Sequence, residues 1–348
     1  LAVKCKYLEH QVMIRPDGEF RLCCISREKT NKETVRNTTI EEWNKGPVIA
    51  KAKEQLANGV FPTACSKCEM FEKAGEESMR TRPRIYGPGV SHLDLRFSNQ
   101  CNLRCVMCYP GSSSSLEIEH HELISKGLES PWAFVETDKF NWFNKERSDE
   151  ITSNPNLREV YLTGGEPMMV KGLDYFISNL DPSVELRFNT NGTLFNPKLF
   201  ELFKRFNHVN LNVSVDGIGK VNDYIRWGSD FTVIEENIQR WQDVAHVNLG
   251  PTVQVLNMLN LEEYIEWADK HNLEIWDNVL VNPTCLHMKN APDELKAKMK
   301  VPDYQHVIDL PADTKEFAEF KKWVNILDTN RGITIRDYVP EIADAYGM

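Results

Sequence analysis

Short apolar runs alternate with amphipathic stretches along the chain from residue 92 onward. The amphipathic stretches repeat apolar residues with a helical period, most clearly over residues 172–180, 196–206, 231–244 and 261–271. The apolar runs have the length and pattern of β-strands and cover residues 92–98, 158–164, 184–190, 209–215, 251–257 and 274–282. Strands that alternate with helices predict successive βαβ units around a parallel sheet. We therefore predict an α/β fold, and these strands fit a partial (β/α)6 TIM-type barrel better than a closed barrel.

The first 85 residues have a different pattern. Residues 12–24 predict a hairpin, in which two alternating runs meet at Pro16-Asp17-Gly18 and the glycine supplies the positive φ of the turn. A helical stretch follows over residues 39–59. Together these elements predict a small α+β module over residues 1–85 that precedes the barrel.

Two further segments complete the predicted organisation. Residues 111–157 are long for a single connection and read as a first helix followed by an insertion. Residues 313–332 carry a helical period that ends at a turn containing Gly332. We predict that the barrel covers residues 86–300 and that a helical extension covers residues 301–348.

The composition is that of an ordinary globular protein, with 348 residues of which 41% are apolar and 26% charged. No apolar run approaches the roughly 18 residues that a membrane helix needs, and the segment after Leu1 does not resemble a signal peptide. The net charge of -10 disfavours nucleic acid as a partner, because phosphate binding usually requires a basic surface. We expect a cytoplasmic protein that binds neither a membrane nor nucleic acid.

Three of the nine cysteines, Cys101, Cys105 and Cys108, form a CxxxCxxC motif directly after the first predicted barrel strand. Active sites of βα barrels lie at the carboxyl ends of the strands, where this motif falls. A 4Fe-4S cluster usually takes four thiolates, so three protein thiolates leave one iron open for another ligand. The alternatives are loop cysteines without a metal, or zinc ligands whose fourth partner lies elsewhere.

The next predicted strand ends in the sequence TGGEP, residues 163–167. Two glycines let the backbone approach a ligand closely, and the carboxylate of Glu166 can meet a cationic group. By itself such a segment is equally consistent with a structural turn. Its position after the second strand of a barrel whose first loop is CxxxCxxC favours a binding role.

These motifs resemble those of radical S-adenosylmethionine (SAM) enzymes over about residues 90–285. The resemblance implies that Cys101, Cys105 and Cys108 hold a 4Fe-4S cluster whose open iron is chelated by SAM, which would be the missing ligand. It also implies a SAM site formed by Met107, Gly164, Gly165, Glu166, Pro167, Asn191, Ser214, Asp216 and Arg226. In this interpretation the glycine-rich segment receives the SAM amino group, and Met107 lies against the adenine. Ser214 and Asp216 reach the carboxylate or ribose, with polar turn residues as the alternative, and Arg226 is a carboxylate partner or a surface ion pair.

A second cysteine set precedes the barrel. The spacing of Cys5, Cys23, Cys65 and Cys68 resembles that of SPASM and twitch modules, which hold auxiliary 4Fe-4S clusters. Four or five cysteines suffice for one cluster, so the shorter twitch type matches better, although such modules usually follow the barrel. Cys24 is an alternative to Cys23, and a structural zinc ribbon is the alternative to a second iron-sulfur cluster. The ninth cysteine, Cys285, is expected to be a small buried apolar residue, with a position facing the substrate as the alternative.

The resemblance implies an enzyme that cleaves SAM reductively and abstracts hydrogen from its substrate. Such an enzyme needs an electron donor such as flavodoxin or ferredoxin. Relatives with auxiliary modules often modify peptides, so we expect modification of a peptide or protein. Oxidation or rearrangement of a small molecule or sugar is the alternative reaction, and a non-catalytic metal-binding protein with a zinc ribbon is the alternative of another class.

Overall fold

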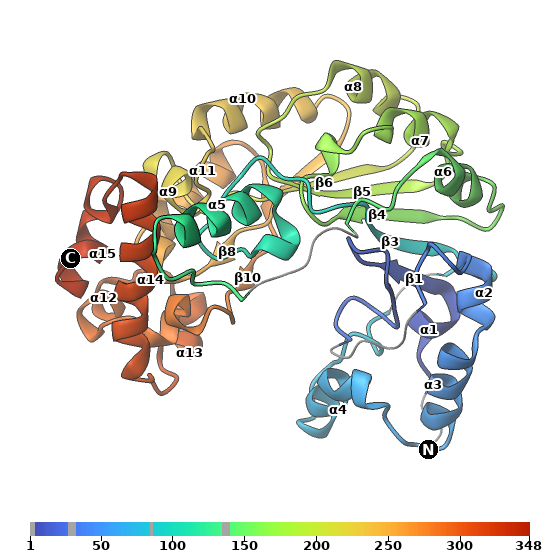
Figure 1. The fold of residues 1–348 in the computed structure, drawn as a ribbon, viewed down its shortest axis with the longest axis horizontal. Helices are drawn as coiled ribbons and strands as arrows, with labels where there is room; N and C mark the ends of the chain where they lie inside the picture. The colour runs from blue at the N-terminus through green and yellow to red at the C-terminus, as the bar shows by residue number, and fades with distance from the viewer. Residues whose placement is uncertain (1–3, 27–32, 84–85, 134–139) are drawn as a thin grey trace. The chain divides into compact units, whose positions relative to one another are not determined.

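The computed structural model describes residues 4–26, 33–83, 86–133 and 140–348 (Figure 1). The chain divides into two compact units. The first unit comprises Leu1–Gln100, Glu136–Asn189 and Pro197–Asn210, and the second comprises Cys101–Val135, Thr190–Asn196 and Leu211–Met348. The division into residues 1–85, 86–300 and 301–348 stays a prediction.

The first unit contains a sheet with the strand order β2-β1-β3-β4-β5. Strands β1 and β2 are antiparallel, whereas β1, β3, β4 and β5 run parallel to their neighbours. Their bounds are Gln11–Ile14 (β1), Phe20–Arg21 (β2), His92–Arg96 (β3), Glu159–Thr163 (β4) and Glu185–Thr190 (β5). The predicted α/β fold with a parallel sheet is therefore confirmed.

The predicted hairpin is also confirmed, and it has a role that its sequence did not reveal. Gly18 has φ +82°, and the amide of Arg15 donates to the carbonyl of Glu19 across the turn. Strand β1 then pairs in parallel with β3, with Gln11 opposite His92 and Ile14 opposite Leu95. The hairpin thus extends the sheet that the later strands build.

Helices α1 to α4 and α6 to α8 belong to the first unit. Their bounds are Lys6–His10 (α1), Ile40–Lys45 (α2), Pro47–Ala57 (α3), Ser66–Lys73 (α4), Lys145–Thr152 (α6), Leu173–Asn179 (α7) and Pro197–Phe203 (α8). The single helix expected over residues 39–59 is two helices, because Gly46 is extended (φ -70°, ψ 166°) before Pro47. A capping box between Thr39 and Glu42 starts α2.

In the second unit, which takes β6 from Leu211 onward, the strand order is β6-β7-β9, and β8 and β10 form a separate parallel pair. The bounds are Val209–Val213 (β6), His246–Leu249 (β7), Thr252–Val253 (β8), Glu274–Ile275 (β9) and Asn278–Val279 (β10). The strand predicted at 251–257 is confirmed only as the short β8, and the strand of the larger sheet, β7, lies earlier and was not predicted. Gly250 and Pro251 interrupt the apolar run, and proline cannot donate a ladder hydrogen bond. The run predicted at 274–282 is likewise divided into two short strands.

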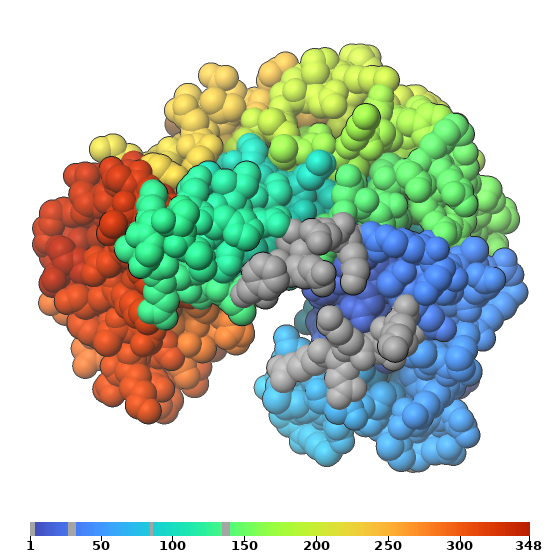
Figure 2. All heavy atoms as spheres, in the orientation of Figure 1, coloured from blue at the N-terminus to red at the C-terminus, as the bar shows by residue number. Residues whose placement is uncertain are grey.

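The remaining helices belong to the second unit. They are Ser114–Ser125 (α5), Lys220–Ile225 (α9), Phe231–Trp241 (α10), Leu261–Lys270 (α11), Asp293–Lys298 (α12), Gln305–Ile308 (α13), Lys315–Arg331 (α14) and Pro340–Tyr346 (α15). Helix α14 confirms the predicted helical tail and ends at Gly332, whose φ is +68°. Figure 2 shows the α5 region, in blue-green, beside the red C-terminal helices on the surface. No helix among the described residues is long and apolar enough to cross a membrane.

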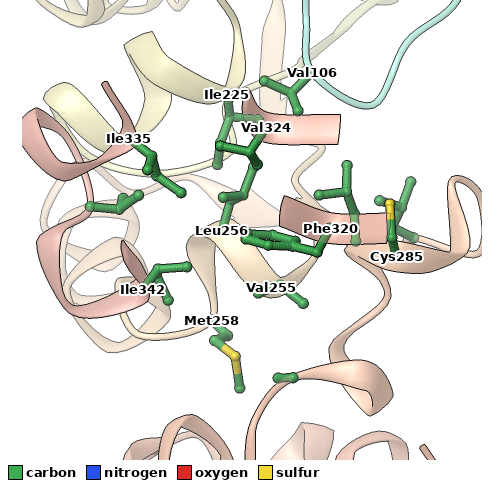
Figure 3. Close-up of a cluster of buried hydrophobic side chains, with 14 of the residues drawn as sticks. Val106, Ile225, Val255, Leu256, Met258, Cys285, Phe320, Val324, Ile335 and Ile342 are labelled. Atoms are coloured by element: carbon green, nitrogen blue, oxygen red, sulfur yellow. The ribbon is translucent and has the colours of Figure 1, made fainter. Parts of the chain in front are cut away.

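One hydrophobic core joins the C-terminal helices to the cysteine loop within the second unit. Figure 3 shows Val106, from between two cysteines of the CxxxCxxC motif, near Ile225 and Val324. Phe320 of α14 is fully buried in the same core. Cys285 is 3% exposed and also packs there, as its isolated position predicted. Packing of α14 therefore supports the loop that carries the cysteine triplet.

Candidate functional site

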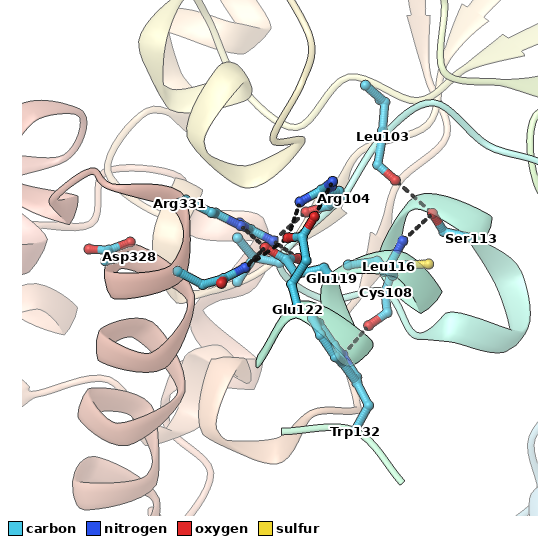
Figure 4. Close-up of polar contacts among 12 residues, drawn as sticks. Leu103, Arg104, Cys108, Ser113, Leu116, Glu119, Glu122, Trp132, Asp328 and Arg331 are labelled. Carbon is cyan, nitrogen blue, oxygen red and sulfur yellow. Dashed lines mark hydrogen bonds and ion pairs between the residues drawn. The ribbon is translucent and has the colours of Figure 1, made fainter. Parts of the chain in front are cut away.

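The cysteine triplet lies on a loop that precedes α5, and the serines after it hold the loop in place. The Ser113 hydroxyl donates to the carbonyl of Leu103 at 2.7 Å, and its oxygen accepts from the amide of Leu116 at the start of α5 (Figure 4). The Ser115 hydroxyl donates to the carbonyl of Cys101 at 2.7 Å. The run of four serines is thus a structural support for the cysteine loop.

Backbone and indole groups bind the rest of this loop. The amide of Arg104 donates to Trp227 (2.8 Å) and that of Val106 to Ile225 (2.7 Å). The indole of Trp132 donates to the carbonyl of Cys108 at 2.9 Å, and that of Trp323 to the carbonyl of Val106 at 3.1 Å. These contacts fix the backbone of the loop, so the three thiols are held on a preorganised frame.

A buried ion pair borders the triplet. The Arg226 Nε atom lies 2.9 Å from Asp216 Oδ2, and the two residues are 7% and 1% exposed. Arg226 Nη1 lies 4.0 Å from the Cys105 sulfur, and the amide of Thr252 donates to Asp216 Oδ1 at 2.6 Å. Burial raises the pKa of Asp216, and the Arg226 charge opposes that rise. The arginine therefore lies where it can neutralise the charge of both the carboxylate and a nearby thiolate.

The protonation of the triplet follows from the same surroundings. Burial raises the pKa of the Cys105 thiol, and the charge of Arg226 lowers it in part. Burial likewise raises the pKa of Cys108 to about 11. Thiols with raised pKa values are neutral at pH 7, so binding of iron must displace their protons.

Asn191 and Met107 also lie at this loop in the second unit. The Asn191 side-chain amide donates to Asn102 Oδ1 at 2.9 Å and lies 3.9 Å from the Cys101 sulfur. Met107 is partly buried and packs against the hydrophobic core. Ser214 is held through its backbone amide, which donates to the carbonyl of Thr190 at 2.8 Å. The second unit thus brings several of the expected residues to one region, namely Cys101, Cys105, Cys108, Met107, Asn191, Asp216 and Arg226.

Residues 164–167 belong to the first unit and pack against the chain just before the triplet. The amide of Gly165 donates to Ser98 (3.1 Å) and that of Glu166 to Gln100 (2.6 Å). A Cβ at Gly165 would lie 2.1 Å from the carbonyl oxygen of Gln100, so no larger residue fits. Gly164 has φ +119°, which strongly favours glycine.

Glu166 is nearly fully buried, at 1% exposure. Its Oε1 atom accepts from the amide of Met168 at 3.0 Å, at the start of a short 3-10 helix over Pro167–Met169. A buried carboxylate beside a glycine cradle fits the binding of a cationic group such as the SAM ammonium. The described residues therefore fit the cofactor that the sequence motifs implied.

The second cysteine set also comes together. The four thiols of Cys5, Cys23, Cys65 and Cys68 line one pocket of the first unit, and Leu8, Leu22, Leu56 and Phe61 supply apolar walls. Burial, and then the neighbouring thiols, raise the pKa of Cys65 to about 12, and burial raises that of Cys23 as well. Cys24 does not line this pocket and, like Cys23, follows β2 rather than lying in it. Among the described residues, no group of three or more His, Cys, Asp or Glu side chains is arranged to hold a single metal ion.

One structural support of the cysteine loop could not be predicted from local sequence. Arg331 Nη2 donates to the carbonyl of Arg104 at 2.7 Å and pairs with Glu119 Oε2 at 2.8 Å (Figure 4). The two side chains are 1% and 0% exposed. They come from α14 and α5, 212 positions apart, so no short motif indicates their pairing.

Comparison with known proteins identifies the family. The model of the radical SAM superfamily matches residues 95–270. The chain belongs to the radical SAM superfamily. Membership makes the chain a radical SAM enzyme and implies SAM and a 4Fe-4S cluster as cofactors, so the resemblance inferred from the motifs is confirmed. The auxiliary module stays a prediction.

Individual relatives are distant from this radical SAM protein. It is 23% identical over 241 residues to the GTP 3',8-cyclase of Helicobacter pylori, covering 67% of this chain and 66% of that protein. It is 26% identical over 144 residues to an uncharacterized protein of Methanocaldococcus jannaschii, covering 40% and 42%. The chain thus spans less than two thirds of these relatives.

Similar solved structures include native anSMEcpe with bound AdoMet, with a TM-score of 0.43 and 17% identity over 70% of this chain and 63% of that one. Streptococcus suis SuiB bound to precursor peptide SuiA has a TM-score of 0.41 and 11% identity over 91% and 60%.

We predict that Arg331→Met lowers the free energy of unfolding by about 3–5 kcal/mol, because Glu119 would be left buried without its counter-charge. Urea denaturation followed by circular dichroism measures the change. Arg336→Met is the control, because Arg336 forms an exposed pair with Asp344 and its loss should cost less than about 1 kcal/mol. Equal effects of the two variants would contradict a special role for the buried pair.

We also predict that Gly165→Ala weakens SAM binding by about tenfold or more, because its Cβ displaces the backbone at Gln100 and with it Glu166. Equilibrium titration of SAM into the iron-reconstituted protein measures this. Gly75→Ala is the matched control, since its φ of +79° strains alanine but its Cβ meets nothing within 4 Å. Unchanged SAM affinity in Gly165→Ala would show that the loop is not part of the cofactor site.

Proposed function

We propose that this radical SAM enzyme modifies a peptide or protein and carries a second, auxiliary 4Fe-4S cluster. The observation that carries the proposal is the pocket lined by Cys5, Cys23, Cys65 and Cys68, in addition to the triplet. Seven thiols in two sets match the ligand requirement of one open and one fully ligated cluster. Such a second set resembles the auxiliary modules of radical SAM enzymes that modify peptides.

In this proposal Cys101, Cys105 and Cys108 hold the cluster that binds SAM. When bound, the cluster and SAM supply a carbon-centred radical that removes hydrogen from an unactivated carbon of the substrate. Glu166, buried beside two glycines, would accept hydrogen bonds from the ammonium group of bound SAM. Asn191 holds the start of the loop through Asn102, and Trp132 holds its end.

Arg226 has a more specific role in this proposal than in the sequence-based expectation. It is paired with Asp216 and lies 4.0 Å from the Cys105 sulfur, so its charge is directed at the cluster ligands. A buried guanidinium lowers the cost of deprotonating a thiol in a poorly solvated site. Asp216 in turn holds the guanidinium and is held by the Thr252 amide, which orients the pair. Direct contact of Arg226, Ser214 or Asp216 with SAM remains part of the proposal.

The four-thiol pocket would hold its cluster with no iron left open, which favours electron transfer or structural support over substrate ligation. Cys5 precedes the first turn of α1, where the backbone amides of Leu8 and Tyr7 lower the pKa of its thiol against the larger effect of burial. Arg80 lines the same pocket and its charge lowers the pKa of Cys65 against the effect of burial. Structural zinc is the alternative occupant.

A small-molecule substrate is the second candidate, because the chain is 23% identical over 241 residues to a GTP 3',8-cyclase. Either substrate requires an external electron donor such as flavodoxin or ferredoxin. Peptide modification is preferred because it also accounts for the four-thiol module, which lies outside the region that the family model matches, residues 95–270.

Replacing Cys105 by alanine is expected to abolish SAM cleavage, because the triplet then holds its cluster through two thiolates. Release of 5'-deoxyadenosine from reconstituted protein and dithionite measures cleavage. Cys285→Ala is the matched control, since Cys285 is buried in the core outside both cysteine sets. Cleavage at the native rate in Cys105→Ala would refute the assignment of the triplet.

Replacing Cys65 by alanine removes a ligand of the auxiliary cluster alone, so the iron content should fall from about eight to about four atoms per chain. The variant should still cleave SAM but should form no modified substrate. Counts of iron, zinc and acid-labile sulfide on protein purified without oxygen measure this. Cys24→Ala should leave the counts unchanged, because Cys24 does not line the pocket. About four irons and one zinc in the unmodified protein would make the module a zinc-binding support instead.

A further inference from the structure

The sheet of the first unit has one apolar face and one polar face. The strand register places Met13, Asp94, Tyr161 and Arg187 in a single row across β1, β3, β4 and β5, with Arg21 of β2 opposite Met13. The apolar face carries Ile14, Leu95, Leu162 and Phe188 in the corresponding row. Strands of buried parallel sheets are usually apolar on both faces, so the charged face of this sheet departs from the common pattern.

Two arginines, Arg15 and Arg96, follow or end neighbouring strands β1 and β3 at their carboxyl ends. The register ends with Ile14 opposite Leu95; Arg15 directly follows β1, and Arg96 is the last residue of β3, on the same face as Asp94. The indole N–H of Trp142 donates to the carbonyls of both Arg15 (2.8 Å) and Arg96 (2.9 Å). One donor that bonds two carbonyls requires the two backbones to be adjacent at this point.

The charges of these two arginines are poorly balanced by the protein. Within the described part of the chain, no carboxylate lies within 4.0 Å of the Arg15 guanidinium, and that of Arg96 has Asp94 at 3.9 Å, too far for a hydrogen bond. The Nε atoms of both arginines are buried without a hydrogen-bond partner there. Arg21 of the same face is instead paired with Glu19 at 3.0 Å. Buried donors without a hydrogen-bond partner are destabilising unless a ligand bonds them, and an anion would also balance the charge of the two arginines.

We propose that Arg15 and Arg96 bind an anionic group of the substrate, a carboxylate or a phosphate. Guanidinium groups match the planar or forked oxygens of these anions through paired hydrogen bonds. Arg96 is opposite Thr163 of β4, and a Cβ at Gly164 would lie 3.1 Å from the Arg96 Cβ, so the pair borders the glycine-rich loop. The inference rests on the proposed function, because it assigns the anion to the substrate of that enzyme.

The test measures anion binding independently of catalysis. Inorganic phosphate and acetate are titrated calorimetrically, at constant ionic strength, into the reconstituted full chain and into Arg15→Gln and Arg96→Gln. We expect saturable binding to the unmodified protein and affinities that are lower by about tenfold or more in each variant. Arg205→Gln is the matched control, since Arg205 is an exposed arginine of the same unit that donates to the carbonyl of Ser178.

Arg96→Lys is a second variant, which keeps the positive charge but removes the forked guanidinium donors. It should bind the anion more weakly than the unmodified protein, and it tests the proposal even if the glutamine variants fold poorly. Selective binding of phosphate would indicate a phosphorylated substrate or nucleotide, and equal binding of acetate would indicate a carboxylate such as that of a peptide. Either result supports the anion site. Absence of saturable binding, equal affinities in the variants, or a tenfold loss of SAM affinity would overturn the proposal. Failure of the proposed function would appear separately, as native SAM cleavage in Cys105→Ala.

Discussion

Parallel hydrogen bonding on both edges of β3 determines where the functional groups of the first unit lie. On one edge, β4 delivers Gly164 and Gly165 to the carbonyls of residues 98–100, which follow β3. On the other edge, β1 brings the backbone of Arg15 near that of Arg96, where the Trp142 indole bonds both carbonyls. A slip of one residue in either pairing would exchange the polar and apolar faces of a strand. The cysteine triplet begins at Cys101, so its first residue follows directly from a segment that this pairing has fixed.

In the second unit, buried ion pairs position the residues around the cysteine loop. The Arg331–Glu119 pair holds the carbonyl of Arg104, and Arg226 with Asp216 lies beside Cys105. Burying such charges is costly, and apolar residues could fill the same volume more cheaply. Their value is positional, because a guanidinium fixed by a buried carboxylate presents its remaining donors in one direction. For Arg226 that direction includes a sulfur that must become a thiolate when iron binds.

Sequence patterns predicted the elements whose signals are local. The alternation of apolar and polar residues predicted the bounds of β3 to β6 to within about two residues. The Pro16-Asp17-Gly18 turn predicted the hairpin, and Gly332 predicted the end of α14. Local signals misplaced β7, where Gly250 and Pro251 divide one apolar run into two strands. Local signals also predicted one helix where α2 and α3 are separate, because the residues on both sides of Pro47 favour a helix. The pairing of β1 with β3 and the contact of Arg331 with Glu119 depend on tertiary packing, which no local pattern encodes.

The position of the cysteine-rich module before the barrel is explained by the same pairing. An unpaired edge of a sheet accepts a further strand from any part of a chain, because the backbone groups it presents do not depend on chain order. The hairpin of β1 and β2 uses the edge of β3, and Cys23 follows β2 into the four-thiol pocket. Cys24 does not line the pocket, and Arg21, two residues before Cys23, lies opposite Met13 on the polar face. One short chain segment would therefore connect a cluster in that pocket to the face on which we place the substrate. This connection needs no element that follows the barrel.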